Sequence, residues 1–173
     1  DDDVKAIAET LNELGRRIAD LGILVAPHPH IWGPIERQHE IERLMALTDP
    51  SLVYLTPDTA HINLGGGDPV FIFDRYWNRI AAIHWKDSKA SYRGYTGPTP
   101  TQEMHWQEIL YKDLGSGGVD HETIWEMIRQ RGYRYWITLD LDPPRPDEGE
   151  GTVEEKILIN RRYLTDTLKV ATL

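Results

Sequence analysis

The stretch LVYLTPDTAHINLGGGDPVFIFDRYWNRIAAIHWKD, residues 52–87, holds two short apolar runs with a helix-like segment between them. The runs Leu52–Asp58 and Ile80–Asp87 are too short for helices and rich in aliphatic residues, so each predicts a buried strand. The segment Asp68–Ile80 predicts a helix, with Asp68 as its N-cap and Pro69 at its first position. Because a strand, a helix and a second strand follow one another, we expect two parallel strands of one sheet.

The same alternation continues on both sides of this stretch. Apolar residues at steps of three and four from Val4 to Leu21 predict a helix that Gly22 stops. Further strands are predicted at Ile23–Pro27 and Tyr135–Asp142, and further helices at about Glu36–Leu47, Asp120–Gly132 and about Thr152–Leu168. The order predicts a parallel α/β fold with four strands, as one domain over residues 1–173.

Two segments of this chain are predicted to lack regular structure. The segment from Ser88 to Gly118 reads as one long loop, which is typical of a lid or a binding loop. The polar segment Arg145–Thr152 is predicted to form a flexible flap over the carboxyl ends of the strands.

Composition limits the classes of function. The chain has 173 residues and a formal net charge of −9, which argues against a nucleic-acid partner because such binding relies on Lys and Arg. It has no Cys, so any metal must be held by His and carboxylates. No apolar run is long enough to span a bilayer, and the first residues do not resemble a signal peptide. We therefore expect a cytoplasmic protein without a membrane partner.

Each predicted strand ends in side chains that can bind a metal or move a proton. In parallel α/β folds these ends meet at one rim, where ligands bind. The strand ends carry His28 and His30; Asp58 and His61; His84, Lys86 and Asp87; and Asp140 and Asp142. Four such ends in four strands predict a site at this rim.

The ordered set of motifs DTAH, HWKD, DLGSGGVD and WITLDLD resembles the xylose isomerase-like TIM barrels, the sugar phosphate isomerase/epimerase superfamily. The run HPHIWGPIERQHEIERLMALTDP, residues 28–50, is most similar to the inosose dehydratase-like branch. The resemblance implies a divalent metal, Mn²⁺, Mg²⁺ or Co²⁺ with Zn²⁺ also possible. It implies the ligands Asp58, His84, Asp140 and Glu36, with His28 or His30 as the alternative to Glu36.

The resemblance also implies roles for neighbouring side chains. His61 resembles a substrate-contacting histidine, and Lys86 a residue that faces the oxygenated carbons of the substrate. The expected catalytic residues are thus Asp140, His61, Lys86 and Glu36, and the expected substrate-binding residues are His28, His30, Trp32 and Trp85. The two tryptophans are included because they lie beside the rim and can stack on a sugar ring.

The chain departs from the family pattern in two ways. Asp140 stands where the family usually has Glu, and its side chain is one methylene shorter. A full barrel has eight strands and typically about 250 residues, whereas this chain predicts four, which would be strands 5–8, the C-terminal half. We therefore expect either a homo-oligomer or pairing with a missing N-terminal half.

A metal at this rim would act as a Lewis acid on a ketone and its neighbouring hydroxyl. The predicted function is an isomerase, epimerase or dehydratase for a sugar, keto-sugar or cyclitol, acting through an enediolate-type intermediate. The alternatives are a non-catalytic half-barrel that pairs with another chain and, less favoured, a metal nuclease similar to endonuclease IV. The sequence does not choose between epimerisation and dehydration.

Several of these residues also have a purely structural interpretation. Asp58 is a possible helix N-cap, and His84 a possible core histidine. Lys86 and Asp87 are a possible local ion pair of small consequence. The remaining histidines, His39, His105 and His121, are predicted to be solvated.

Overall fold

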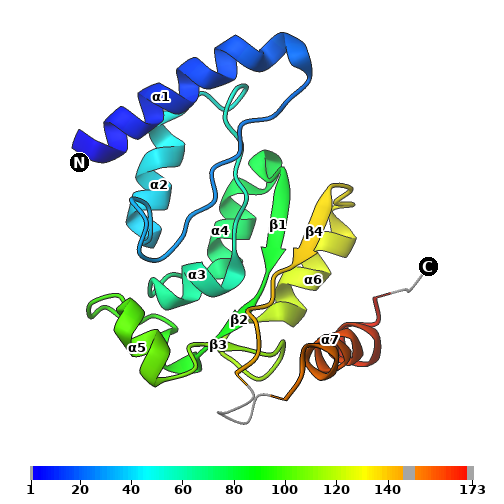
Figure 1. Ribbon diagram of the computed structural model, residues 1–173. Helices are drawn as coiled ribbons and strands as arrows, with labels where there is room; N and C mark the ends of the chain where they lie inside the picture. The colour runs from blue at the N-terminus through cyan, green and yellow to red at the C-terminus, as the bar shows by residue number, and fades with distance from the viewer. Residues whose placement is uncertain (1, 146–150, 171–173) are drawn as a thin grey trace.

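The computed structural model describes residues 2–145 and 151–170 (Figure 1). Its α-helices are α1 (Asp2–Ile18), α2 (Gln38–Leu47), α3 (Thr59–Leu64), α4 (Pro69–Tyr76), α5 (Gln102–Gln107), α6 (His121–Gln130) and α7 (Val153–Arg162). Its strands are β1 (Ala82–Trp85), β2 (Asp87–Ser88), β3 (Tyr111–Lys112) and β4 (Trp136–Leu139). Short 3-10 turns occupy Ala19–Leu21, Trp77–Arg79 and Ala90–Tyr92, and Tyr163–Thr167 forms a turn of π-helix.

Parallel pairing joins four segments of the chain in their sequence order. The regular pair is β1 with β4, in which Ala82 lies opposite Trp136 and Trp85 opposite Leu139. The two earlier segments contribute single parallel bridges: Val25 with Val53, Leu55 with Ile80, and Asp58 with His84. The predicted parallel α/β arrangement is thereby confirmed, as a partial barrel.

The first two predicted strands are irregular because of their prolines. Proline has no N–H to donate to a ladder, so a run that contains it pairs only in part. The carbonyl of Pro27 still accepts from Thr56 N at 3.0 Å, and that of Pro57 accepts from His84 N at 3.1 Å. These bonds keep the segments in register at the end where the polar side chains lie.

The four parallel segments together form the partial barrel, which we call the arc. Its two outer segments carry exposed apolar side chains. Ile23 is 56% exposed and Leu24 46%, so the prediction of a buried strand at Ile23–Pro27 was wrong for these two residues. At the other edge, Trp136 of β4 is 83% exposed. The physical reason is the same at both edges, since no further strand of the described chain covers their outer side.

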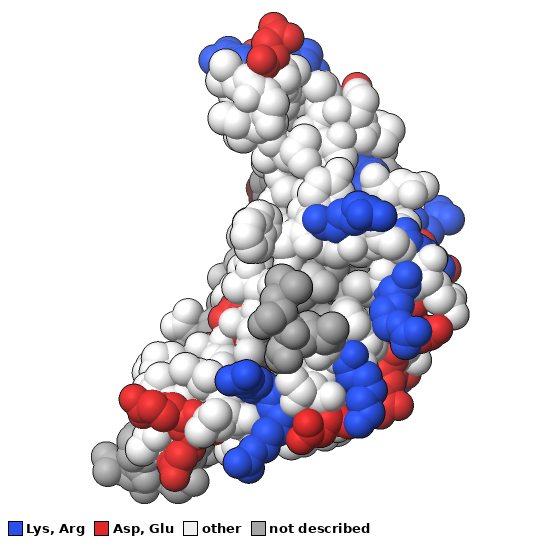
Figure 2. All heavy atoms as spheres, turned by 90° about the vertical axis from the view of Figure 1, so that its right-hand side faces the viewer, with Lys and Arg blue, Asp and Glu red and all other residues white. Residues whose placement is uncertain are grey.

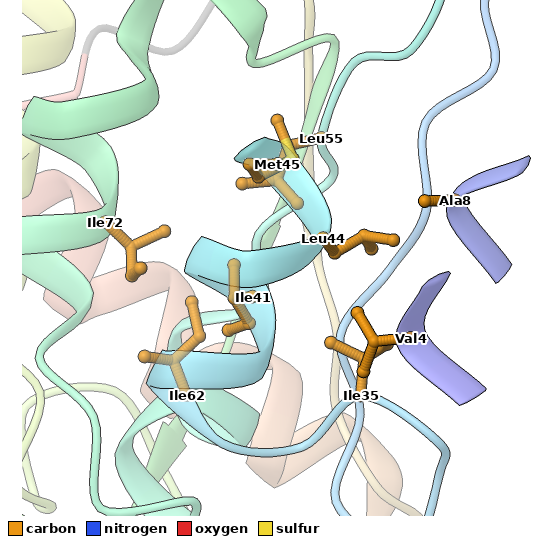
Figure 3. Close-up of a cluster of buried hydrophobic side chains, with 9 residues drawn as sticks. All are labelled: Val4, Ala8, Ile35, Ile41, Leu44, Met45, Leu55, Ile62 and Ile72. Atoms are coloured by element: carbon orange, nitrogen blue, oxygen red, sulfur yellow. The ribbon is translucent and has the colours of Figure 1, made fainter. Parts of the chain in front are cut away.

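The helices pack on the arc through two buried apolar clusters. The first joins α1, α2, α3 and α4 to the second extended segment, and Figure 3 shows its members, Val4, Ala8, Ile35, Ile41, Leu44, Met45, Leu55, Ile62 and Ile72. The second lies between α4, α6 and β1, around Phe73, Ile83, Trp85 and Ile124. Burying each such Leu, Ile or Phe contributes about 1.5–3 kcal/mol. These clusters lie between the helices and the parallel segments and so hold the strand ends in place.

The prediction that the segment from Ser88 to Gly118 is one long irregular loop was wrong. It contains α5 and returns to pair β3 with β2 in antiparallel fashion, with Asp87 opposite Lys112 and Ser88 opposite Tyr111. A pair of two-residue strands is too short to produce an alternating pattern in the sequence. Because β3 pairs with β2, Tyr111 lies close to the strand ends.

The predicted helix starts agree with the structure. Asp68 accepts from Val70 N at 2.9 Å, Asp120 from Thr123 N at 3.0 Å, and Thr152 forms a capping box with Glu155. The short helix α3 was not predicted, and it begins directly after Asp58. The proposed flap at Arg145–Thr152 falls largely on residues 146–150, which lie outside the described residues.

The face that carries the edge of β4 is the right-hand side of Figure 1 and faces the viewer in Figure 2. Lys and Arg lie beside Asp and Glu along the borders of this face, and much of it is uncharged. Across the described residues, no helix combines the length and the apolar character needed to cross a membrane.

Candidate metal centre

Asp58 uses its two carboxylate oxygens for different purposes. Oδ1 accepts from the backbone N–H groups of Ala60 and His61, both at 2.9 Å, and so caps α3. Oδ2 lies 3.5 Å from Nε2 of His28 and 3.8 Å from Nδ1 of His84. The structural and the functional interpretations of Asp58 are therefore compatible, because each concerns a different oxygen.

These three residues come from three neighbouring segments of the arc. One ligand atom from each of His28, Asp58 and His84 lies within 4.8 Å of the other two. All three atoms are buried, and none has a hydrogen-bond partner among the described residues. Buried polar atoms are normally paired by hydrogen bonds. Three unpaired ligand atoms that face one another therefore fit a bound cation. Two imidazole nitrogens and one carboxylate oxygen suit a borderline divalent ion.

The electrostatics of Asp58 favour its charged form. Burial by itself raises the pKa of the Asp58 carboxyl, but the imidazole of His28 and the neighbouring His61 outweigh it. The resulting pKa lies below the ordinary carboxyl value. The group is thus an anion, as a metal ligand must be.

Asp140 and Asp142 lie at the end of the next strand and flank Lys86. Nζ of Lys86 is 2.6 Å from Oδ1 of Asp142 and 3.5 Å from Oδ1 of Asp140. Asp140 also reaches the three-residue group, with Oδ2 at 3.4 Å from Nδ1 of His84. The alternative interpretation of Lys86 and Asp87 as a local ion pair was wrong, because the lysine instead points to the end of β4.

Glu36 lies close to the rim, but other groups bind its carboxylate. Oε2 accepts from the backbone N–H of Trp32 at 2.8 Å, and Oε1 accepts from the hydroxyl of Thr99 at 2.7 Å. It is not among the three residues whose ligand atoms converge. Its role as a ligand stays a prediction, and His28, the expected alternative, holds the position facing Asp58.

The rings of His61 and His30 lie against each other, tilted by 33°, next to this group. Their ring centroids are 3.6 Å apart, and the ring of His28 lies 5.6 Å from each. Burial is the main cause that lowers the pKa of His61 to about 3, so its imidazole is neutral at physiological pH. Of the predicted residues, His28, His30, His61, His84, Lys86, Asp58 and Asp140 therefore lie at one rim.

The two tryptophans have different environments. Trp32 is half-buried at the rim, with its indole N–H donating to the carbonyl of Pro100 at 2.6 Å and its ring 5.8 Å from that of His105. Trp85 points to the other side of β1, is 2% exposed, and donates its indole N–H to Nδ1 of His121. That location leaves Trp85 no surface on which a sugar ring can stack.

Asp87 and His121 form a second buried cluster. His121 is 1% exposed, so its predicted solvation was wrong, and its Nε2 lies 3.3 Å from Oδ2 of Asp87. Four backbone N–H groups also donate to the Asp87 carboxylate, those of Ser88, Gly115, Gly117 and Val119. The glycine-rich turn is therefore an anion-binding turn whose anion is this chain's own carboxylate. A side chain at Gly117 would occupy the place of Asp87.

A cavity of about 470 Å³ opens beside Asp142 and Tyr111. Its other lining residues include His105, Trp106 and Arg145, none of which the strand-end pattern indicates. Arg145 donates to the backbone carbonyl of His105 at 2.8 Å, so the end of the fourth segment is tied to α5. The half-buried His105 was predicted to be solvated, and that prediction was wrong because α5 folds back onto the rim.

The family model described as "Xylose isomerase-like TIM barrel" matches residues 1–162. The chain belongs to this family. The resemblance seen in the strand-end motifs is thereby confirmed.

Curated relatives of this TIM-barrel chain include two inosose dehydratases. That of Lacticaseibacillus casei is 31% identical over 179 residues, which cover 98% of this chain and 56% of the relative. That of Clostridium beijerinckii is 32% identical over 142 residues, which cover 80% of this chain and 47% of the relative. The chain thus spans about half the length of the curated relatives it matches.

Solved structures show the same fold at lower identity. The IOLI protein, crystallised with a bound zinc atom, superposes with a TM-score of 0.67 at 18% identity, over 98% of this chain and 58% of that one. The probable 3-DHS dehydratase AsbF of Bacillus anthracis has a TM-score of 0.68 at 17% identity, over 94% of this chain and 57% of that one. These likenesses support the partial barrel of parallel strands.

Proposed function

We propose that this chain carries the metal-binding part of a dehydratase that acts on a cyclitol ketone such as an inosose. The observation that carries the proposal is the set of three buried, unpaired ligand atoms of His28, Asp58 and His84 at neighbouring strand ends. The dehydratase assignment is supported by the inosose dehydratases, the curated relatives that match over nearly the whole chain.

We propose His28, Asp58 and His84 as the ligands of a divalent ion, Mn²⁺, Co²⁺ or Zn²⁺ before Mg²⁺. The order follows from the donor atoms, since imidazole nitrogen suits the transition ions and Mg²⁺ prefers oxygen. When bound, the ion supplies Lewis-acid chemistry that makes a C–H next to a ketone more acidic. Asp140 borders these three residues, with Oδ2 at 3.4 Å from Nδ1 of His84, and is not counted among the ligands.

The remaining rim residues account for the proton transfers of a dehydration. In that reaction a base takes the proton from the carbon next to the ketone, and the electron pair of this bond forms a carbon–carbon double bond. The bond from the next carbon to its hydroxyl breaks, and the hydroxyl leaves as water with a proton that the Lys86 ammonium gives. We assign the base to the Asp140 carboxylate, because it lies between the proposed ligand His84 and the Lys86 ammonium.

Lys86 is suited to the side of the leaving hydroxyl. It is 5% exposed, and its ammonium group is held by Asp142 at 2.6 Å and borders Asp140 at 3.5 Å. An ammonium in this position donates hydrogen bonds to an oxygen that gains negative charge. Isomerisation or epimerisation would use the same proton removal and would return the proton to carbon without loss of water.

The two edges of the arc suggest how the site is completed. Trp136 is exposed on β4 at one edge and Ile23 at the other, and the chain spans about half the length of its relatives. We propose that further parallel strands cover both edges, supplied by the other half of a barrel of which these are strands 5–8, or by a second copy. In the non-catalytic alternative the chain pairs in this way without turning over a substrate.

Turnover of candidate substrates in deuterated water tests the proposal. The full-length protein, loaded with Mn²⁺, Co²⁺ or Zn²⁺, is incubated with inosose and with ketohexoses, and products are followed by mass spectrometry. We expect a product of inosose that has lost one water. An intact product that carries deuterium would assign the site to an isomerase or epimerase, and no reaction of the metal-loaded protein with any substrate would contradict the enzyme assignment.

A further inference from the structure

Tyr111 lies at the strand ends although it belongs to none of them. It sits on β3 and is 6% exposed, because the antiparallel pair of β3 with β2 folds it over the rim. Its hydroxyl is 3.3 Å from Nδ1 of His61. The face of its ring lies 4.1 Å from Nζ of Lys86. Tyr111 thus contacts two of the residues assigned to the site.

The contact with Tyr111 decides which nitrogen of His61 carries the proton. A buried phenol needs an acceptor for its O–H, and among the described residues Nδ1 of His61 is the acceptor within reach. Nδ1 accepts this bond only when it has no proton. In a neutral imidazole the proton is then on Nε2, so that His61 presents an N–H at its other nitrogen.

The neighbouring His30 has the opposite arrangement. Its Nδ1 lies within hydrogen-bond distance of the backbone carbonyl of Ile31. A carbonyl only accepts, so the proton of neutral His30 is on Nδ1 and its Nε2 keeps a lone pair. The two neighbouring rings therefore offer one donor and one acceptor side by side.

We infer that Tyr111 is a positioning residue of this site, which fixes the tautomer of His61 so that its Nε2–H donates to a substrate oxygen. A neutral imidazole held in this way acts as a hydrogen-bond donor to developing negative charge and not as a base. The ring of Tyr111 also supports the Lys86 ammonium through a cation–π contact. The consequence for turnover rests on the proposed function, whereas the tautomer does not.

The tautomer can be measured without activity. Long-range ¹H–¹⁵N NMR spectra of the ¹⁵N-labelled full-length protein distinguish the protonated from the unprotonated ring nitrogen, and the His61→Gln variant assigns the signals. In the wild type we expect the proton on Nε2 of His61. In Tyr111→Phe, which keeps the ring and removes the hydroxyl, we expect the two His61 signals to shift toward each other as both tautomers become populated.

Tyr92→Phe is the matched control, because Tyr92 is buried in the same apolar cluster as Tyr111. It should leave the His61 spectrum unchanged. For the substrate that the wild-type protein turns over, kcat of Tyr111→Phe should fall about 10- to 100-fold, with little change in KM. Such a loss is typical when a group that orients a functional side chain is removed.

Two outcomes would overturn the inference: a proton on Nδ1 of His61 in the wild type, or a His61 spectrum that Tyr111→Phe leaves unchanged. The first does not depend on Tyr111→Phe, so the inference remains testable even if that variant does not fold. If the tautomer is as expected but no substrate is turned over, the proposed function fails and the positioning role of Tyr111 stands.

Discussion

Asp58 and Asp87 are two buried aspartates at the ends of neighbouring strands, and they differ in what their oxygens contact. Both oxygens of Asp87 accept from backbone N–H groups, and His121 lies beside it. In Asp58, one oxygen caps α3, and the other has no hydrogen-bond partner and faces His28 and His84. The fully paired carboxylate of Asp87 stabilises the fold, and the half-paired carboxylate of Asp58 is the proposed metal ligand.

The pKa shifts of the two groups have the same sign and similar causes. For Asp87, burial raises the pKa, and the imidazole of His121 together with the backbone N–H groups outweighs it. For Asp58, burial likewise raises the pKa, and the imidazoles of His28 and His61 together with the backbone N–H of His61 outweigh it. Replacing imidazole contacts by a cation would favour the same charged form, whereas the amide contacts of Asp87 leave no room for one.

The largest effect is expected for Asp87→Ala. The variant leaves the backbone N–H groups of Ser88, Gly115, Gly117 and Val119 without their acceptor and removes the carboxylate beside the buried His121, so the free energy of unfolding should fall by about 3–5 kcal/mol. Chemical denaturation followed by circular dichroism measures it. A fall of less than about 1 kcal/mol would show that the glycine-rich turn does not depend on this carboxylate.

Acid unfolding provides an independent check on Asp87. Because its pKa in the fold is below the ordinary value, its stabilisation is complete above the ordinary carboxyl pKa of about 3.9 and is lost as the pH falls through the folded value. The wild type should therefore lose stability more steeply below that pH than Asp87→Asn. Parallel curves for the two proteins would contradict this.

The next effect concerns which residue completes the ligand set. His28→Gln should weaken divalent-metal binding by about 10- to 100-fold, since it removes a nitrogen that faces Asp58. Glu36→Gln keeps an oxygen for the N–H of Trp32 and is expected to change the affinity much less. Calorimetric titration of both variants compares them, and the reverse order would return Glu36 to the ligand position predicted from the sequence.

The smallest effect separates capping from ligation. Asp68 also caps a helix, α4, but it is exposed and faces no histidine pair. Asp68→Ala should cost about 1 kcal/mol of stability, as is usual for an N-cap, and leave metal affinity unchanged. A loss of metal binding in this variant would mean that binding reports general stability.

The sequence predicted the residues that follow from chain order. Parallel strands with short crossovers bring their carboxyl ends together, so Asp58, His84 and Asp140 could be named from position alone. It did not predict Tyr111 or the contact of Asp87 with His121. Both depend on how the segment after Ser88 turns back, which two-residue strands and single glycines determine without any periodic pattern. The exposure of Ile23 was missed because an apolar run does not reveal whether it lies at an edge.

Metal titration of Asp58→Asn tests the central claim most directly. Asparagine keeps a side-chain oxygen for the amides of Ala60 and His61 but removes the charge that faces the two histidines. We predict that the wild type binds one divalent ion per chain, and that Asp58→Asn binds it roughly 100-fold more weakly while its metal-free unfolding free energy stays within about 1 kcal/mol. Equal affinity in the two proteins, or no binding by the folded wild type, would contradict the account.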